Sequence, residues 1–110
     1  MIRILPLQYD DNAKFCLYED ARLLAECPYD PKTGEIYGII DRADAARPLY
    51  AALIKAVLSS LEYAGVETAS CRREDLFPLL KALRFTVADG TATVSLKGYF
   101  DAPCEGSKTK

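Results

Sequence analysis

Apolar residues in the first part of the chain form short segments separated by turn residues, a pattern that predicts strands. We expect strands over residues 2–7, 14–18, 22–29 and 35–40. Pro6 indicates that the first strand ends there or lies at the edge of a sheet. Before the fourth segment, Pro31 suits the first corner of a type I turn and Gly34 suits the left-handed position that follows. This part of the chain therefore predicts antiparallel hairpins.

The clearest helical pattern covers residues 48–64. Pro48 stands in the opening turn, where a missing N–H costs little, and Gly65 follows the last turn. Apolar residues recur at helical spacing and leave Lys55, Ser59 and Glu62 as an exposed stripe. So broad an apolar face predicts a helix that packs on a sheet.

The rest of the chain predicts a strand, a second helix and a final hairpin. We expect a strand over residues 66–71, a helix over 74–84, and strands over 85–88 and 91–97. Asp89-Gly90 has the composition of a two-residue hairpin turn. Across all these elements the predicted core consists of Leu53, Val57, Leu61, Leu79, Leu83, Phe85 and Val94.

Composition and charge exclude several classes of function. The 110 residues suit one domain over residues 1–100, followed by a polar C-terminal tail over residues 101–110. A net charge of −2 provides no basic surface for nucleic acid. No apolar run reaches the roughly 18 residues of a membrane span, and Arg3 and Pro6 interrupt the apolar start, unlike a signal-peptide core. We therefore expect a cytoplasmic protein with no nucleic-acid or membrane partner.

The sequence contains no histidine, which restricts its chemistry. This excludes Ser-His-Asp and Cys-His mechanisms, His-ligated metals and the commonest general base. The four cysteines, Cys16, Cys27, Cys71 and Cys104, have long and irregular spacings. Neither a zinc site nor a disulfide framework has this pattern, so we predict four free thiols and no metal.

The order of elements and several short motifs resemble the GCN5-related N-acetyltransferase (GNAT) family over most of the chain, residues 2–97. The motifs are Leu53-Ile54 in the long helix, Gly65 after it, the strand that ends at Cys71, and Leu79–Phe85, which is similar to the family's Leu-Tyr-x-x-x-Gly-Phe. The resemblance implies an α/β (α+β) fold with a mixed, mostly antiparallel sheet of six to seven strands and two main helices. The chain looks like a minimal and degenerate member.

In that family acetyl-CoA lies where the fourth and fifth strands separate. A loop of the form Arg/Gln-x-x-Gly-x-Gly/Ala opens the long helix, and its amides bind the pyrophosphate. The resemblance places this loop at residues 45–50, where Ala45, Pro48 and Tyr50 replace the three motif residues. Proline donates no N–H, and tyrosine adds bulk where a phosphate approaches. The resemblance therefore implies weak binding of acetyl-CoA or another acyl-CoA.

Three further family features are replaced in this chain. Only residues 8–13 stand where the family has two early helices that help to shape the acceptor site. Leu80 stands at the tyrosine that often protonates the leaving thiolate, and Arg84 stands at the glycine before Phe85. The catalytic positions of the family are thus altered along with the cofactor loop.

The resemblance implies a set of candidate cofactor-binding residues around the loop: Ile40, Arg42, Ala46, Arg47, Leu49 and Tyr50. Arg42 and Arg47 suit phosphate binding without glycine, and they equally suit a solvated surface. Cys71 is the one catalytic candidate, because the family model places it at the cofactor groove, where neighbouring positive charge would lower a thiol pKa. A small buried core residue is the alternative reading of Cys71.

Two hypotheses of function follow. The first is an acyl-CoA-dependent N-acyltransferase with an eroded pyrophosphate loop, or a diverged relative that binds acyl-CoA. The second is a non-catalytic GNAT-like scaffold for protein interaction or self-association, with a homodimer or another protein as partner. Because fold alone does not imply activity, acetyl-CoA binding discriminates between them.

Overall fold

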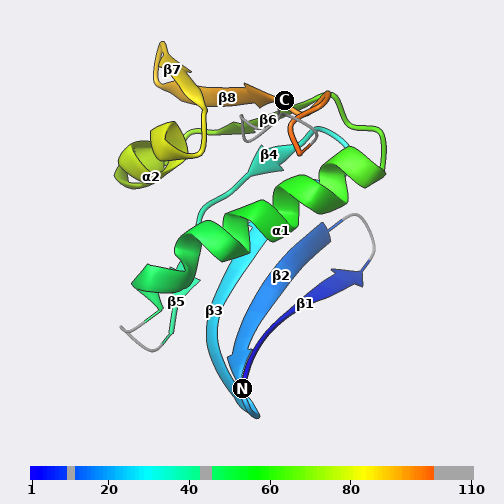
Figure 1. Ribbon diagram of the computed structural model, residues 1–110, viewed down its shortest axis with the longest axis vertical. Coiled ribbons are helices and arrows are strands. Elements are labelled where there is room, and N and C mark those ends of the chain that lie inside the picture. Colours follow the sequence, from blue (N-terminus) through cyan, green and yellow to red (C-terminus); the bar gives the residue numbers. More distant parts are fainter. Residues whose placement is uncertain (10–11, 43–45, 101–110) are drawn as a thin grey trace, which may run out of the picture.

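The computed structural model describes residues 1–9, 12–42 and 46–100. One mixed sheet carries the long helix across one face (Figure 1). The helices are α1 (Tyr50–Tyr63) and α2 (Phe77–Ala82), preceded by 3₁₀ turns at Arg47–Leu49 and Glu74–Leu76. The strands are β1 (Ile2–Tyr9), β2 (Asn12–Glu19), β3 (Arg22–Tyr29), β4 (Glu35–Ile36), β5 (Ile40–Asp41), β6 (Thr68–Cys71), β7 (Thr86–Ala88) and β8 (Thr91–Ser95).

The strand order in the sheet is β1-β2-β3-β4-β6-β8-β7, and β5 also pairs with β3. The pair of β4 and β6 is parallel and the other pairs are antiparallel. This confirms the predicted fold class. Neither helix of the described residues is long and apolar enough to cross a membrane.

Gly38 divides the predicted fourth strand into β4 and β5, which brings the described sheet to eight strands. Its φ of +131° is a conformation that glycine adopts readily and other residues do not. Before Gly38, Ile36 pairs with Cys71 of β6. After Gly38, Ile40 and Asp41 pair with β3. The chain therefore diverges from β6 just beyond Ile36.

The predicted turns form as expected. Gly34 has a φ of +82°, and a Cβ there would lie 2.3 Å from the carbonyl oxygen of Thr68, so both conformation and space require glycine. Asp89 and Gly90 both have positive φ, as a two-residue hairpin turn of type I′ requires. Pro6 lies within β1, which continues to Tyr9, and β1 is an edge strand. The sequence indicated that Pro6 either ends the first strand or lies at the edge of a sheet, and the edge is confirmed.

The core lies between α1 and the sheet, where α1 packs on β2 and β3. Six of the predicted core residues are buried: Leu53, Val57, Leu61, Leu83, Phe85 and Val94. The seventh, Leu79, is only partly buried, whereas Leu80 is fully buried. Leu76 and Leu80, four residues apart across the 3₁₀ turn and α2, form the inward stripe, so Leu79 falls on its flank.

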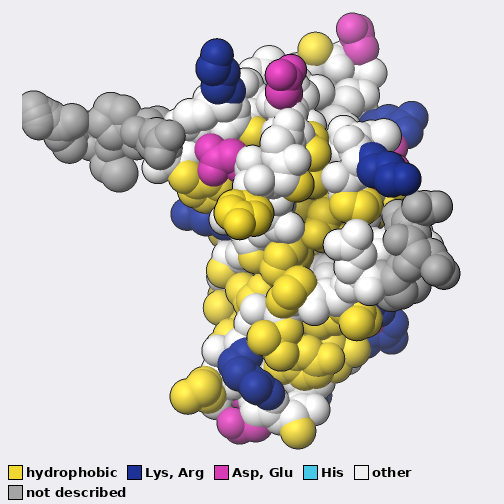
Figure 2. Space-filling view, turned by 90° about the vertical axis from the view of Figure 1, so that its right-hand side faces the viewer, with side chains coloured by type: hydrophobic (Ala, Val, Ile, Leu, Met, Phe, Trp, Pro, Cys, Tyr) yellow, Lys and Arg dark blue, Asp and Glu magenta, His cyan; other side chains and the backbone are white. Residues whose placement is uncertain are grey.

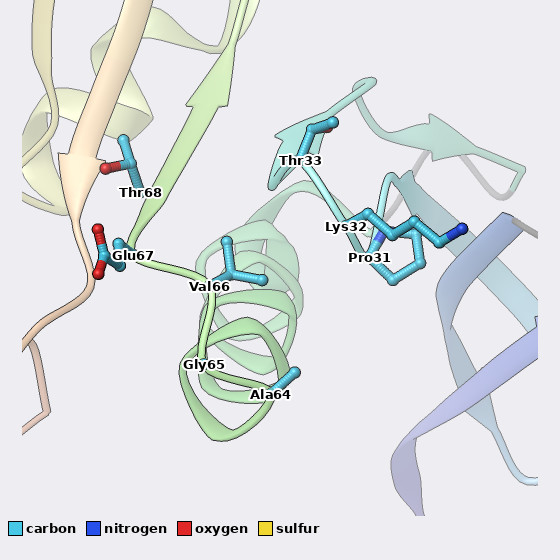
Figure 3. A pocket seen from close by; sticks show the side chains of 8 residues that line it. All are labelled: Pro31, Lys32, Thr33, Ala64, Gly65, Val66, Glu67 and Thr68. Carbon is cyan, nitrogen blue, oxygen red and sulfur yellow. The ribbon is translucent and has the colours of Figure 1, made fainter.

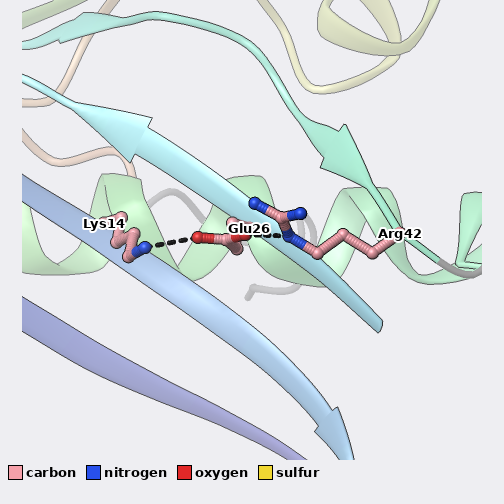
Figure 4. A network of polar contacts seen from close by, with 3 residues as sticks. All are labelled: Lys14, Glu26 and Arg42. Atoms are coloured by element: carbon pink, nitrogen blue, oxygen red, sulfur yellow. Dashed lines mark hydrogen bonds and ion pairs between the residues drawn. The ribbon is translucent and has the colours of Figure 1, made fainter. Parts of the chain in front are cut away.

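Glu26 is the buried charged residue among the described residues, and it lies on the sheet face opposite α1 (Figure 4). It accepts hydrogen bonds from Lys14 Nζ and from Arg42 Nε. The hydrogen bond from Lys14 lowers the pKa of Glu26 below its ordinary value of 4.5, and Arg42 adds to this against the opposing effect of burial. Glu26 is therefore a paired carboxylate that joins β2, β3 and the chain after β5.

We expect Glu26→Gln to lower the free energy of unfolding by about 1–3 kcal/mol near neutral pH, because it removes charge-assisted hydrogen bonds. The pKa of Glu26 is lower in the folded chain than in the unfolded chain. Its contribution is therefore fully present above pH 4.5 and is lost as the pH falls through the lowered pKa. Urea unfolding of both proteins along a pH series measures this difference.

The matched control is Glu35→Gln, which removes the exposed ion pair of Glu35 with Arg72. Such surface pairs contribute about 0–1 kcal/mol, so this variant should change little. A deficit of Glu26→Gln that stayed constant as the pH fell well below 4.5 would show that the carboxylate charge is not what stabilises the fold.

Candidate functional site

A pocket of about 220 Å³ opens where the two helical segments begin. It is lined by Arg47, Tyr50, Asp75, Leu76, Pro78 and Leu79. Arg47 comes from the 3₁₀ turn before α1 and Tyr50 from the first position of α1, and the other residues come from the 3₁₀ turn before α2 and from α2 itself. Two of the predicted cofactor residues, Arg47 and Tyr50, thus lie together in one pocket.

The backbone of this loop offers few free amides. The 3₁₀ turn uses the N–H of Leu49, which donates to the carbonyl of Ala46 at 2.8 Å, and the N–H of Tyr50, which donates to the carbonyl of Arg47. Pro48 has no N–H. Three consecutive positions, 48 to 50, therefore have no amide available for an anion.

The side chain of Tyr50 is tied to the sheet. Its hydroxyl donates a 2.8 Å hydrogen bond to Oδ2 of Asp41 in β5. Burial raises the pKa of Tyr50, and the hydrogen bond to Asp41 raises it further, so the phenol is neutral and serves as a donor at physiological pH. This contact connects the start of α1 to the strand that has diverged from β6.

Arg73 lies against the chain at the point of divergence. A Cβ on Gly38 would come within 2.6 Å of Nη1 and 3.2 Å of Cγ of Arg73, so the arginine side chain packs directly on this glycine. Its guanidinium is held by Asp75, with Nε at 3.0 Å from Oδ1 and Nη2 at 3.1 Å from Oδ2. The region where β5 separates from β6 is therefore occupied by a side chain of the protein itself.

The remaining cofactor candidates do not gather at the pocket. Arg42 is directed to Glu26, and Ile40, which pairs with Glu26, shares its side of the sheet, opposite α1. Ala46 is fully buried and Leu49 is partly buried against the core. Ala45, the first position of the expected loop motif, lies outside the described residues. The structure thus brings together two of the six candidates.

The pKa of the catalytic candidate, Cys71, is raised and not lowered. Its side chain has no exposed area, and burial raises the thiol pKa more than the nearby Arg73 lowers it. Burial also raises the pKa of Cys27 to about 12, with a smaller contribution from Cys71. Burial therefore favours the protonated form of both thiols, which are core groups. Cys16, Cys27 and Cys71 are free and buried, and Cys104 lies outside the described residues.

Sequence reasoning did not assign Arg73 or Asp75 to the site. Both belong to a polar segment that is typical of an ordinary helix start, and the contact of Arg73 with Gly38 joins residues far apart in the chain. The available signal was Gly38 itself, because a glycine inside a strand pattern often marks the close approach of another group.

A larger hollow of about 630 Å³ lies elsewhere, between the turn after β3 and the loop after α1 (Figure 3). Its lining includes Lys32, Thr33 and Glu67, and it contains none of the predicted site residues. Lys32 points away from Glu67 in this view, so the charged groups do not converge. We therefore place the candidate site at the smaller pocket. No cluster of His, Cys, Asp or Glu in the described parts of the chain could hold a metal.

No protein-family model matches the sequence, and no curated protein matches it. Among solved structures, the chain is similar to the ribosomal-protein-S18-alanine N-acetyltransferase from Escherichia coli, at 18% identity and a TM-score of 0.63, covering 81% of this chain and 72% of that chain. It is also similar to mutant forms of the spermidine/spermine N-acetyltransferase SpeG from Vibrio cholerae, at 10% identity and a TM-score of 0.65, covering 86% of this chain and 72% of that chain. A third similar structure is a mutant AtaT toxin bound to the C-terminus of the antitoxin AtaR, at 14% identity and a TM-score of 0.57, covering 88% of this chain and 73% of that chain.

The chain has the GNAT fold. At such low sequence identity, the structural similarity shows the fold alone and does not show the activity.

Arg84, which stands at the glycine of the expected GNAT motif, keeps a glycine-like conformation with a φ of +75°. Its Nη2 donates to the carbonyl of Tyr99 at 2.8 Å, and the guanidinium lies 4.1 Å from the centre of the Tyr99 ring. The Tyr99 hydroxyl donates in turn to the carbonyl of Leu83 at 2.7 Å. These contacts offset the roughly 1–2 kcal/mol that a left-handed conformation costs a non-glycine residue, so the turn before Phe85 forms without a glycine.

Proposed function

We propose that this chain uses its GNAT fold as a non-catalytic scaffold for protein contact and self-association, with acyl-CoA binding reduced to a weak residual affinity. One observation carries the proposal: positions 48 to 50, where a GNAT loop is expected to bind pyrophosphate, offer no free amide. A phosphate at this place would meet the proline ring of Pro48 and amides already paired within the 3₁₀ turn.

The surrounding side chains support the proposal. Tyr50 is anchored to Asp41, and Arg73 packs on Gly38 where the strands diverge. An acyl-pantetheine arm would have to displace one or both of these groups. Displacing Arg73 would separate it from Asp75, and displacing Tyr50 would break a hydrogen bond of a partly buried phenol.

The catalytic positions also oppose acyl transfer. Leu80 is a fully buried leucine where the family's tyrosine is expected to protonate the thiolate. Cys71 is buried with a raised pKa, and the sequence has no histidine to act as a base. The groups that would move protons in an acyl transfer are therefore replaced by apolar or neutral ones.

The second candidate function, acyl-CoA-dependent N-acyl transfer, is favoured by the pocket itself. The 220 Å³ hollow lies at the start of the long helix and has the exposed Arg47 in its lining. An arginine at this place is able to pair with a phosphate without the help of backbone amides. This contact is the basis of the residual affinity that we propose.

Calorimetric titration with acetyl-CoA tests the proposal. Each lost charge-assisted hydrogen bond weakens binding by about 1.5–3 kcal/mol. The loss of two therefore weakens binding roughly 100-fold or more, which turns a dissociation constant of about 10 µM into one of about 1 mM or weaker. Arg47→Ala serves as the matched variant and should remove the residual binding. A dissociation constant in the low micromolar range, accompanied by acetyl transfer to amines, would reject the scaffold proposal in favour of the enzyme.

A further inference from the structure

β1 is an open edge of the sheet, and it is apolar. Figure 2 turns the right-hand side of Figure 1 toward the viewer, and apolar side chains gather over its lower half, where β1 runs. Ile2, Leu5 and Leu7 are 42%, 41% and 47% exposed. A long, exposed, apolar edge strand is a template for pairing with another strand.

The exposed residues of β1 lie on both faces of the sheet. Ile4 pairs with the buried core residue Leu17, so the even-numbered residues, Ile2 among them, are on the α1 side. Leu5 pairs with Cys16 and, like Leu7, is on the opposite side. A partner that covered one face would leave the other exposed, whereas a strand added along the edge contacts both.

Alternate backbone N–H and C=O groups of β1 point away from β2, toward the open side of the sheet edge. The N–H of Asp20 donates to the carbonyl of Met1 at 2.9 Å, which fixes the phase of the ladder between β1 and β2. By the alternation of an antiparallel pair, the odd-numbered residues of β1 bond to β2, and Ile2, Ile4 and Gln8 direct their N–H and C=O groups outward. Pro6 occupies an outward position, so its missing N–H takes nothing from β2.

We propose that β1 pairs with β1 of a second copy of this chain, antiparallel, about a two-fold axis at Leu5. Two sheets then join into one continuous sheet across the dimer. The inference rests on the proposed scaffold function, and it names the partner and the surface that this function uses.

The strand is self-complementary in this register. Ile4 lies opposite Pro6 of the other copy, so its outward N–H meets the proline carbonyl, and Ile2 lies opposite Gln8, where both residues have donors and acceptors. Leu5 meets its own copy directly. Arg3 lies opposite Leu7, which leaves the two arginines about 14 Å apart along the strand direction. No like charges are opposed, and at the centre of the strand Ile4, Leu5 and Pro6 face apolar residues.

The other edge of the sheet does not compete for this role. β7 has three residues, against eight in β1. Of the two edges that the described chain presents, only β1 is long enough to form a ladder of several hydrogen bonds. A strand-to-strand contact buries less area than a standard interface of about 1,600 Å², so we expect a reversible dimer with a dissociation constant of about 10–100 µM.

Sedimentation velocity over a concentration series that spans this range tests the proposal. The expected result is a shift from the 12.2 kDa chain to twice that mass. Leu5→Lys places two positive charges directly opposite each other and should weaken the dimer at least about 10-fold. Leu5→Glu should do the same. An equimolar mixture of the two variants should form a heterodimer, because the charges then attract.

Two controls separate the edge from other surfaces. Ile40→Lys adds a charge to the face opposite α1, and Tyr63→Lys adds one to the end of α1, at residues that are 45% and 95% exposed. Both should dimerise like the parent chain. Gln8→Pro removes an outward donor and should weaken the dimer, whereas Gln8→Ala keeps the donor and should not. If a thermal melt shows that the Leu5 variants are unfolded, the two Gln8 variants test the proposal in their place.

Several results would overturn the proposal: a monomer at the highest concentrations, dimers that persist in folded Leu5→Lys or Gln8→Pro, no association in the mixture, or loss of the dimer in Ile40→Lys. These outcomes are distinct from a failure of the proposed function, which shows as low-micromolar acetyl-CoA binding and acetyl transfer in the calorimetric and activity assays whatever the oligomeric state.

Discussion

Replacing Leu53 with alanine is expected to lower the free energy of unfolding by about 2–5 kcal/mol. Leu53 has no exposed area and begins the buried stripe of α1, which continues with Ile54, Val57 and Leu61. The helix packs on β2 and β3, so the truncated side chain leaves a cavity between two regular elements that cannot close over it easily. A loss of this size is a large part of the stability of a small domain.

Urea denaturation followed by circular dichroism measures this loss, and Leu79→Ala is the matched control. Leu79 has the same side chain but is only partly buried on the flank of α2, so its truncation should cost clearly less. If Leu53→Ala changed the free energy of unfolding by less than about 0.5 kcal/mol, the packing of α1 on the sheet would be wrong.

The local parts of the fold were predictable because their causes are local. The broad apolar face of residues 48–64 gave α1, and the positive-φ preference of Gly34 and of Asp89-Gly90 gave the turns. Pro6 indicated an edge strand because an edge is where a missing N–H is tolerated. Each of these inferences depends on residues within one or two turns of chain.

Two errors remain, one at a contact between distant residues and one at a local change of helix type. The fourth strand divides at Gly38, where Arg73, which is remote in sequence, packs on the glycine. Leu79 is only partly buried because a 3₁₀ turn, whose spacing differs from that of an α-helix, precedes α2. A periodicity argument assumes one uniform helix and cannot detect such a phase change.

The place of Pro48 and Tyr50 at the start of the long helix was predictable, and the contacts of this segment were not. Alignment with the family motif placed Pro48 and Tyr50 at the start of the long helix, and the structure has them there. The hydrogen bond from Tyr50 to Asp41 and the paired amides of Leu49 and Tyr50 follow from the three-dimensional path of the loop. These contacts strengthen the argument against pyrophosphate binding beyond what the residue types alone supplied.

The double variant Pro48→Gly, Tyr50→Gly is expected to bind acetyl-CoA about 100-fold more tightly than the parent chain. Glycine at position 48 restores an amide donor, and glycine at both positions lets the backbone leave the 3₁₀ turn so that its amides turn outward. Two recovered charge-assisted hydrogen bonds at about 1.5 kcal/mol each correspond to this factor. Calorimetric titration measures it directly.

Two single variants separate the causes of this gain. Pro48→Ala restores the N–H with less added flexibility than glycine, and Tyr50→Phe removes only the hydroxyl that bonds to Asp41. If the missing amide of Pro48 is part of the barrier, Pro48→Ala should recover part of the affinity and Tyr50→Phe almost none. The glycines should cost about 1 kcal/mol of stability each, so a thermal melt must show that the double variant is folded at the titration temperature. A folded double variant with no gain in affinity would mean that the loop is not the barrier, and that Arg73, packed on Gly38, closes the site by itself.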